Sequence, residues 1–334
     1  MPFLRRLHLD VSAISAFCGR HRFRSRQDAF VNVLLRNPKA FERVQNVLDQ
    51  EDAIARPLLC QLEAEVPPDK TPSMILRDLI VHKPDIRQLV ATSLSRSPTT
   101  EEVSRARSSR PLVHQVLNRC ATALRRTPAY LDVVSSTKVE EKDLGATHSE
   151  AKKILEQDQI QDPKVLKKLA SLPACDRGRD LECSAQPQWE HLLRQEGLHV
   201  VDRQVAVGMD LTVGDTVVHV RGRVDILARR TEDDAMIVLE IKNRLRTFFS
   251  PSYDLDQLCV YLVASPPDRT MGYLLEQCQG RQRMGYLMTR SEAEERWIQD
   301  IVPRLRTAVK DFVKAVETPT DAPVWQGLTT SRIG

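Results

Sequence analysis

The feature that most constrains the fold is a change of sequence pattern after residue 197. Runs rich in β-branched and apolar residues, bounded by Gly, Asp and charged turn residues, then follow at 199–207, 216–228, 235–242, 271–279 and 282–288. Such runs are typical of β-strands. Residues 254–264 and 292–316 instead carry apolar side chains at helical spacing, although Pro303 should kink or divide the second helix. This order predicts an α/β sandwich rather than a barrel or a bundle.

Residues 28–172 show a helical pattern interrupted by turn residues. Apolar side chains recur at helical spacing in 28–35, 41–48, 74–80, 86–94, 112–124 and 129–134. Thr99, with Glu102 three positions later, has the signature of a capping box at the start of a helix. We therefore expect an all-α accessory domain over 28–172, with a polar connector near 135–153.

The first 27 residues carry six arginines but a single acidic residue, Asp10. Their apolar side chains would line one face of a basic helix: Phe3, Leu4, Leu7, Val11 and Ile14. An Arg-rich, acid-poor amphipathic segment has the composition of a mitochondrial presequence, whereas a basic arm that binds nucleic acid is the other interpretation. We expect residues 1–27 to be a targeting segment of a mitochondrial protein, with the nucleus as the alternative location. Residues 319–334 would form a tail.

The composition argues against several classes of protein. No run approaches the roughly 18 consecutive apolar residues of a membrane-spanning helix, so a membrane partner is not expected. The seven cysteines are scattered without a C-x-x-C pair, which fits reduced thiols and gives no support for a disulfide framework, a zinc site or an iron–sulfur cluster. The formal net charge of +4 permits binding to nucleic acid, but only through a local basic surface.

Residues able to bind a divalent cation gather on the predicted strands. Glu240 and Lys242 are two positions apart on one strand, so their side chains project to the same face of the sheet. Asp225, which ends the preceding strand in Gly222-Arg-Val-Asp225, can join them. Two carboxylates at adjoining positions suit Mg²⁺ or Mn²⁺, since these ions take oxygen ligands and keep several waters. The Lys242 ammonium would bind a scissile phosphate and orient the attacking water.

The stretch from Gly222 to Tyr261 resembles the PD-(D/E)XK nuclease superfamily, and within it the RecB-like branch. Four elements occur in order: Gly222-x-x-Asp225, Glu240-x-Lys242 after apolar residues, an interval of 15 residues between the two acids, and Gln257-x-x-x-Tyr261 on the following helix. The resemblance implies a restriction-endonuclease-like mixed β-sheet flanked by helices over 173–318, preceded by the all-α domain. In overall plan the chain resembles mitochondrial DNA-maintenance exonucleases.

The resemblance also implies a set of metal ligands. Asp225, Glu240 and the main-chain carbonyl of Ile241 would bind Mg²⁺ or Mn²⁺. Members of the family usually carry a further acidic residue on the helix before the sheet. Glu182 is the candidate here, with Glu190 as the alternate, and it would complete the ligand set or hold a second metal.

The remaining matched residues would serve the substrate. Lys242 would position the attacking water, Gln257 would position metal-bound water or phosphate, and Tyr261 would shape the path of the nucleic acid. Arg244 and Arg246, with two phenylalanines just after them, would contact phosphates and bases at the mouth of the site. An equally good interpretation makes this segment a loop that covers the sheet.

These expectations describe a metal-dependent nuclease that hydrolyses phosphodiester bonds. Its partner would be nucleic acid, with DNA favoured by the resemblance, and it would act in DNA maintenance or repair as an exonuclease on single-stranded or free ends. The alternative is an inactive nuclease-fold protein that binds nucleic acid, or a scaffold protein of a mitochondrial complex. Protein partners are left open by the sequence.

Overall fold

The computed structural model describes residues 4–22, 24–66, 72–82, 97–104, 118–136, 139–161, 163–184, 186–244, 247–278 and 281–319. The chain divides into two compact units. The sheet unit comprises Met1–Asn37, Ser136–Val139 and Asp176–Lys314, and the helical unit comprises Pro38–Ser135, Glu140–Cys175 and Ala315–Gly334.

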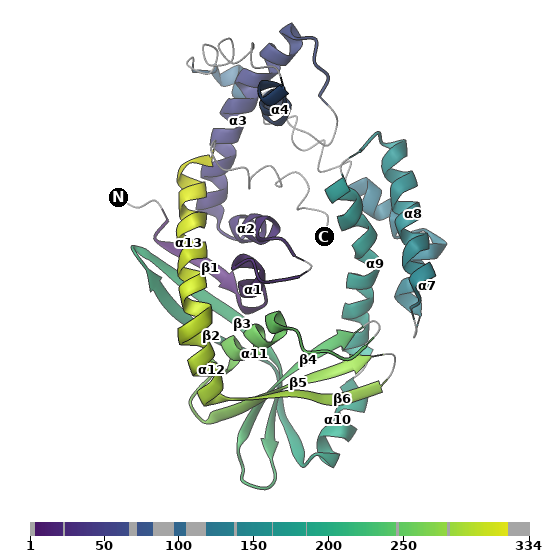
Figure 1. Cartoon of the computed structure of the whole chain (residues 1–334), viewed down its shortest axis with the longest axis vertical. Helices are drawn as coiled ribbons and strands as arrows, with labels where there is room; N and C mark the ends of the chain where they lie inside the picture. The colour runs from purple at the N-terminus through teal and green to yellow at the C-terminus, as the bar shows by residue number, and fades with distance from the viewer. Residues whose placement is uncertain are drawn as a thin grey trace. The chain divides into compact units, whose positions relative to one another are not determined.

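The sheet unit contains one six-stranded mixed β-sheet (Figure 1). Its strands are β1 (Arg6–Asp10), β2 (Leu198–Val213), β3 (Thr216–Arg230), β4 (Met236–Arg244), β5 (Arg269–Cys278) and β6 (Arg281–Thr289). The order is β1-β3-β4-β5-β6, with β2 paired along β3 as well. The β1–β3 and β4–β5 pairs are parallel, and the other pairs are antiparallel. The predicted α/β class is therefore confirmed, and all five strands predicted after residue 197 are present.

Helices cover both faces of this sheet. On one face, α10 (Gln186–Gln195) packs Trp189 and Leu193 against a cluster of strand residues that alternate along β3 and β4: Ile226, Ala228, Ile237, Leu239 and Ile241. The intervening residues of β4, Glu240 and Lys242, face α11 (Ser252–Val263) on the other side. This alternation follows from the two-residue period of a strand. It gives β4 one apolar face for the core and one polar face for the site.

The last helical segment is divided, as Pro303 predicted. It runs as α12 (Arg290–Arg296), a π-helical turn η3 (Trp297–Ile301) and α13 (Val302–Glu317). Proline lacks a backbone N–H and clashes with the carbonyl four residues earlier. A wider turn just before Pro303 accommodates both effects within one continuous helical path. Among the described residues no helix is long and apolar enough to span a membrane.

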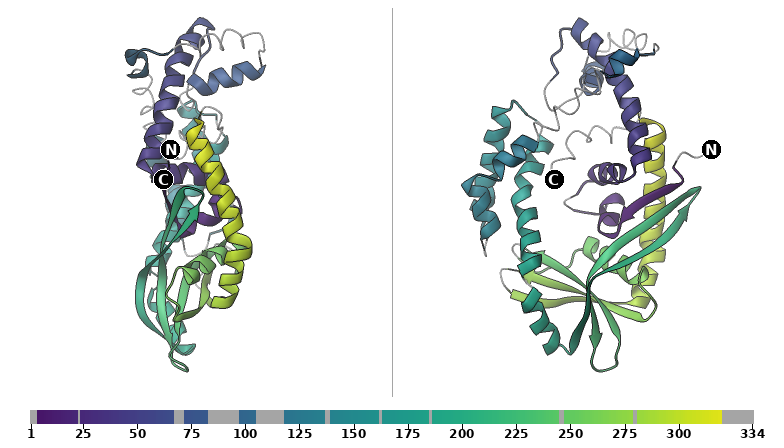
Figure 2. Two further views of the ribbon diagram at one scale, coloured as in Figure 1. Left: turned by 90° about the vertical axis from the view of Figure 1, so that its left-hand side faces the viewer. Right: turned by 180° about the vertical axis from the view of Figure 1, so that it is seen from behind.

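The N-terminal segment differs from the predicted basic helix. Arg6–Asp10 forms β1, which lies parallel to the first part of β3 and pairs Leu7 with Val218 and Leu9 with Val220 (Figures 1 and 2). Leu7 and Leu9 are buried while Arg6 and His8 are exposed, so the period is two and not 3.6. The exposed edge of β3 supplies the hydrogen-bond partners that favour a strand. A targeting role for residues 1–27 stays a prediction.

The residues after β1 also belong to the sheet unit. They form η1 (Val11–Ala13), α1 (Ile14–Phe17) and α2 (Arg26–Leu35). Phe17, Phe30 and Phe312 pack together, with ring centroids 4.7–5.7 Å apart. Residues 28–37 therefore lie with the sheet rather than with the helical unit to which the sequence assigned them, because their apolar face is buried against α13.

The helical unit is built from α3 (Pro38–Gln61), α4 (Pro72–His82), α7 (Pro128–Ser135), α8 (Glu141–Gln157) and the first part of α9 (Pro163–Ser184). Helix is confirmed at 41–48, 74–80 and 129–134, while 86–94 and 112–117 lie outside the described residues. The Thr99 capping box is confirmed: the Thr99 N–H donates to Glu102 (2.8 Å), and the Glu102 N–H donates to the Thr99 hydroxyl (3.2 Å).

The polar connector predicted near 135–153 is instead mostly helical, since α8 begins at Glu141. The Glu140 N–H donates to the Asp143 carboxylate (2.8 Å), which satisfies one of the unpaired donors at the helix start. Thr147, Ala151 and Leu155 are buried at four-residue spacing. This narrow apolar stripe was hidden by the charged residues around it.

Candidate active site

Gly222, the first residue of the G-x-x-D motif, allows α11 to approach the sheet. A Cβ atom at this position would lie 2.8 Å from Cε1 of Tyr261 and 2.8 Å from Cγ2 of Val11. A larger residue would force these side chains to move, so glycine is what lets the Tyr261 ring rest on β3 as it does. The glycine of one motif and the tyrosine of another are thus in direct contact, which explains why they occur together.

Asp225 lies where β3 and β4 part. The last backbone pair of the two strands is Ile226 with Leu239. Beyond it, Oδ2 of Asp225 accepts a hydrogen bond from the backbone N–H of Ile241 (2.8 Å), which replaces the ladder bond that the separation removes. Its Oδ1 accepts a bond from the Gln204 side-chain amide (3.0 Å). The carboxylate is therefore held at both oxygens.

Glu240, Lys242 and Gln257 form a closed set of contacts on the α11 side of the sheet. The Lys242 ammonium donates to Oε1 of Glu240 (2.8 Å) and to the Gln257 carbonyl oxygen (2.7 Å). The Gln257 amide donates to the same Glu240 oxygen (2.7 Å) and to the Tyr261 hydroxyl oxygen (3.1 Å). Residues from the strand motif and the helix motif thus meet at one place.

The electrostatics of this set follow from burial. Burial raises the pKa of Glu240 well above its usual value, and the nearby Asp225 charge adds to this, while Lys242 opposes it. Burial alone would lower the pKa of Lys242, but the Glu240 and Asp254 carboxylates outweigh it and raise that pKa. Burial also raises the pKa of Tyr261, so its hydroxyl stays neutral at physiological pH.

The buried carboxylate of Glu240 offers an oxygen atom that could bind a hard divalent cation. Oε2 of Glu240 is buried and receives no hydrogen bond from a donor in the described structure; either a proton shared with the neighbouring Asp225 carboxylate or a bound cation would satisfy it. A cation there would also favour the charged form of the carboxylate. Within the described ranges, no group of three or more His, Cys, Asp and Glu residues is arranged to hold a metal. The ligands would thus be two carboxylates, a main-chain carbonyl and water.

Arg244 does not face solvent. Its side chain is only 7% exposed, and Nη2 contacts Asp254 (2.7 Å) and Glu276 (3.2 Å). The guanidinium also lies 4.7 Å from the centroid of the Phe249 ring. Arg244 is the last residue of β4 and not part of a covering loop, and its buried acidic partners turn its guanidinium away from a phosphate at the mouth of the site. Arg246 lies outside the described residues.

The two candidates for the additional acidic ligand are not brought into this cluster by any described contact. Glu182 lies on α9, and its side chain is outside the described residues. Glu190 lies on α10, whose apolar residues pack on the opposite face of the sheet, and its carboxylate is paired with Arg203 and Arg194. Glu190 therefore serves as an ion-pair partner.

Three residues beside the site were not identified from the sequence. Asp254 lies 3.7 Å from the Lys242 ammonium, and Gln204 holds Asp225. His21 stacks on Tyr253, with ring centroids 4.2 Å apart, and burial together with the Arg24 charge lowers its pKa to about 4. The signal for Gln204 was available, because counting back from the turn between Val213 and Thr216 places it opposite Asp225.

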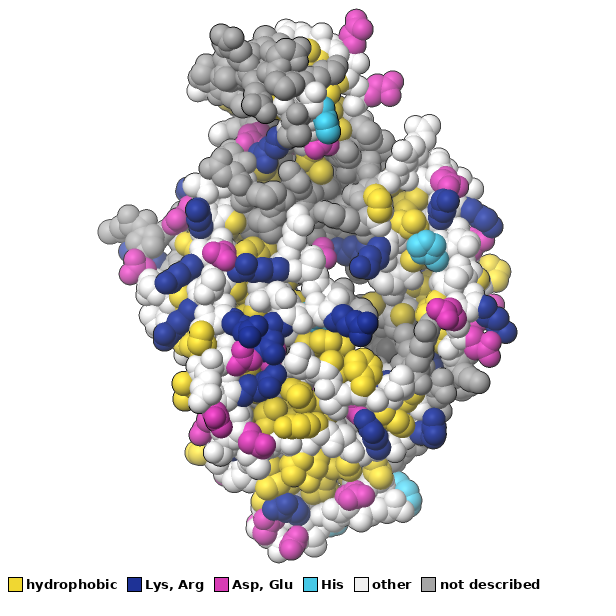
Figure 3. Space-filling view, in the orientation of Figure 1, with side chains coloured by type: hydrophobic (Ala, Val, Ile, Leu, Met, Phe, Trp, Pro, Cys, Tyr) yellow, Lys and Arg dark blue, Asp and Glu magenta, His cyan; other side chains and the backbone are white. Residues whose placement is uncertain are grey.

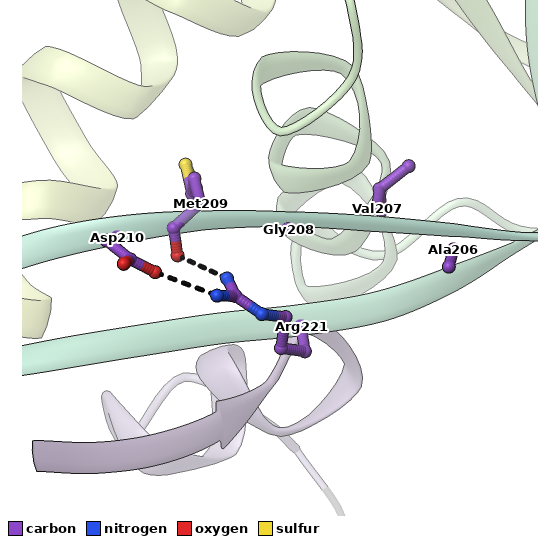
Figure 4. Close-up of a pocket in the computed structure, with 6 residues that line it drawn as sticks. All are labelled: Ala206, Val207, Gly208, Met209, Asp210 and Arg221. Carbon is purple, nitrogen blue, oxygen red and sulfur yellow. Dashed lines mark hydrogen bonds and ion pairs between the residues drawn. The ribbon is translucent and has the colours of Figure 1, made fainter.

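The surface of the sheet unit offers a further feature away from this cluster. A shallow depression over β2 and β3 is lined by Ala206, Val207, Gly208, Met209, Asp210 and Arg221. Figure 4 shows Arg221 donating to the Met209 carbonyl oxygen (3.1 Å) and pairing with Asp210 (3.1 Å). On the face drawn in Figure 3, Lys and Arg side chains lie beside hydrophobic ones, with acidic side chains interspersed. The depression contains none of the predicted catalytic residues.

Comparisons with known proteins identify no family. No protein-family model matches the chain, and no curated protein matches it. Among solved structures, the crystal structure of a protein named SSO0001 aligns over 60% of this chain and 84% of its own, with 17% sequence identity and a TM-score of 0.31. A likeness of this size supports no conclusion about fold or function.

Proposed function

We propose that this chain is a metal-dependent nuclease that hydrolyses phosphodiester bonds in DNA, acting as an exonuclease on single-stranded or free ends. The observation that carries the proposal is the contact set formed by Glu240, Lys242, Gln257 and Tyr261 beside Asp225. Residues spread over three separate motifs converge there. If these motifs occurred in the sequence by chance, their side chains would not be expected to hydrogen-bond to one another.

The metal is proposed to be Mg²⁺ or Mn²⁺, held by Asp225, Glu240 and the main-chain carbonyl of Ile241. When bound, it would stabilise negative charge on the phosphate oxygens and make a bound water more acidic. Glu240 suits this role because one of its oxygens is buried and receives no hydrogen bond from a donor in the described structure. Asp225 suits it because its carboxylate is oriented at both oxygens, while each oxygen keeps a further lone pair.

The remaining residues act on the substrate and the water. The Lys242 ammonium has three N–H donors, of which two are used by Glu240 and Gln257, so one remains for a phosphate oxygen or the attacking water. Gln257 fixes the direction of this third N–H, because it hydrogen-bonds both to the Lys242 ammonium and to the Glu240 carboxylate that the ammonium contacts. Tyr261 accepts a bond from Gln257 and holds the amide in place. Its raised pKa argues against a role as a base.

The surroundings of the site are compatible with a polyanionic partner. Arg22 and Arg24 are both exposed beside His21, whose ring stacks on that of Tyr253. Positive charge near a hydrolytic site favours binding of phosphates. We further propose that the protein acts in DNA maintenance or repair in mitochondria, with the nucleus as the alternative.

The test is degradation of end-labelled single-stranded and double-stranded DNA and RNA with Mg²⁺, with Mn²⁺ and with a chelator. We expect metal-dependent release of nucleotides from DNA ends that is lost in Asp225→Asn and Lys242→Ala. Lys310→Ala, an exposed lysine on α13, is the matched control and should keep full activity. Cleavage retained in the two site variants, or absent from the unmodified protein in every condition, would refute the proposal.

A further inference from the structure

Gln204 has an unusual backbone conformation for a residue within a strand. Its φ is +52°, in the left-handed region that non-glycine residues avoid, although it lies in the middle of β2. The pairing of β2 with β3 is interrupted at this residue. Arg203 pairs with Ile226 and Val205 pairs with Val224, but Gln204 and Asp225, which lie between them, do not pair through their backbones.

The side chain of Gln204 replaces the missing backbone contact. Its Nε2 donates to Oδ1 of Asp225 over 3.0 Å. Gln204 is exposed, so burial of an apolar group does not explain why the strained conformation is kept. Strained backbone that persists without a packing reason is characteristic of functional sites.

The second oxygen of Asp225 is held by the opposite strand. Because the Ile241 N–H donates to Oδ2 and Gln204 donates to Oδ1, the carboxylate plane is fixed by one neighbour on each side. Partners that orient a ligand in this way commonly change metal affinity by roughly 10- to 100-fold when they are removed.

We propose that Gln204 is a positioning residue that orients the Asp225 carboxylate to receive a divalent cation. The inference rests on the proposed function, since it assumes that Asp225 is a metal ligand. It assigns Gln204 no contact with the substrate. The strain in β2 then serves to direct one amide at one carboxylate.

The experiment measures binding of Mn²⁺ alone to the full chain, by electron paramagnetic resonance, together with the melting temperature without metal. In Gln204→Gly the side chain is removed, and the left-handed conformation is no longer strained. We expect its Kd for Mn²⁺ to rise roughly tenfold, while the melting temperature is kept or raised. A purely structural role for Gln204 predicts the reverse: a lower melting temperature and an unchanged Kd.

Two further variants complete the test. Gln159→Gly makes the same change at a left-handed glutamine in the helical unit, where φ is +58°, and should leave the Kd unchanged. Gln204→Asn keeps an amide and tolerates a left-handed backbone, but it is one methylene too short to hold Asp225 as Gln204 does, so its Kd should also rise. If Gln204→Gly does not fold, Gln204→Asn is the variant that tests the proposal.

The outcomes separate this inference from the proposed function. If the unmodified protein binds Mn²⁺, Asp225→Asn does not, and a folded Gln204 variant binds as tightly as the unmodified protein, the positioning role is wrong and the metal site stands. If the unmodified protein binds no better than Asp225→Asn, both fail together. Weakened binding in the Gln204 variants with intact melting temperatures supports the proposal.

Discussion

Nη2 of Arg244 lies 2.7 Å from Oδ2 of Asp254, and the other oxygen of that carboxylate is 3.7 Å from the Lys242 ammonium. The Asp254 carboxylate therefore lies between the Arg244 guanidinium and the Lys242 ammonium and links the two side chains. The arginine is also paired with Glu276, which is fully buried. Asp254 is shared by two cations of β4, and this fixes the start of α11 against the strand.

Arg244→Gln should destabilise the sheet unit strongly. Removing the buried cation leaves the buried Asp254 and Glu276 carboxylates with only Lys242 and the more exposed Arg283 as charged partners, which costs up to about 3–5 kcal/mol. Urea unfolding measures the change. Arg283→Ala removes a much more exposed partner of the same Glu276 and should cost at most about 1 kcal/mol. An Arg244 variant with unchanged stability but weaker DNA binding would show that Arg244 contacts phosphate after all.

Gly222→Ala should lower stability by about 1–3 kcal/mol, because the added methyl group forces the Tyr261 ring and Val11 away from β3. The proposed nuclease activity should fall as well, since Tyr261 holds Gln257. Gly145→Ala is the control: nothing lies within 4 Å of its added atom, and on α8 alanine should stabilise by up to about 1 kcal/mol. Equal effects of the two substitutions on unfolding would contradict the close contact.

Removal of residues 1–17 should prevent the sheet unit from folding. It deletes β1 and α1, including five large apolar side chains that are at most 1% exposed: Leu7, Leu9, Val11, Ile14 and Phe17. At about 1.5–3 kcal/mol each, their burial is comparable to the whole stability of a typical domain. Circular dichroism and limited proteolysis would report the loss. Arg6→Ala, an exposed change on β1, should fold normally.

The same result bears on the predicted targeting role. If residues 1–27 direct import into mitochondria, they should remain on the folded protein, because cleavage near residue 27 would remove β1. A fusion of residues 1–30 to a fluorescent reporter tests the targeting, and N-terminal sequencing of the protein recovered from mitochondria tests the retention. A folded, active protein that begins near residue 28 would disprove the structural role of β1.

The cysteines should differ sharply in reactivity. Burial raises the pKa of Cys18 and of Cys259 to about 12, so at pH 8 both stay protonated; Cys259 is buried and Cys18 half-buried, whereas Cys60 and Cys175 are exposed. Iodoacetamide should label Cys60 and Cys175 readily in the native protein, Cys18 slowly, and Cys259 only after unfolding, as peptide mass spectrometry would show. Because these raised pKa values favour the protonated folded state, stability should fall as the pH rises from about 9 towards 12.

Much of the sheet unit was predictable because its signals are local. Strands β2 to β6 follow from β-branched runs, and the shared face of Glu240 and Lys242 follows from the period of a strand. β1 was missed because five residues with two buried leucines carry little information until the edge of β3 is known. The burial of Arg244 was likewise undetermined, since both of its acidic partners come from other elements.

Pairing between β1 and β3 also sets the order in which the molecule can assemble. Leu7 meets Val218, so the first strand to leave the ribosome must wait for a partner that is made after most of the helical unit. Contacts this distant in sequence are slow to form, because the entropy cost of closing a long loop comes before the contacts can stabilise the structure. Until then the apolar side of the N-terminal segment has no place to pack. A chain synthesised or translocated from its N-terminus would present this segment to chaperones for longer than any other strand of the sheet.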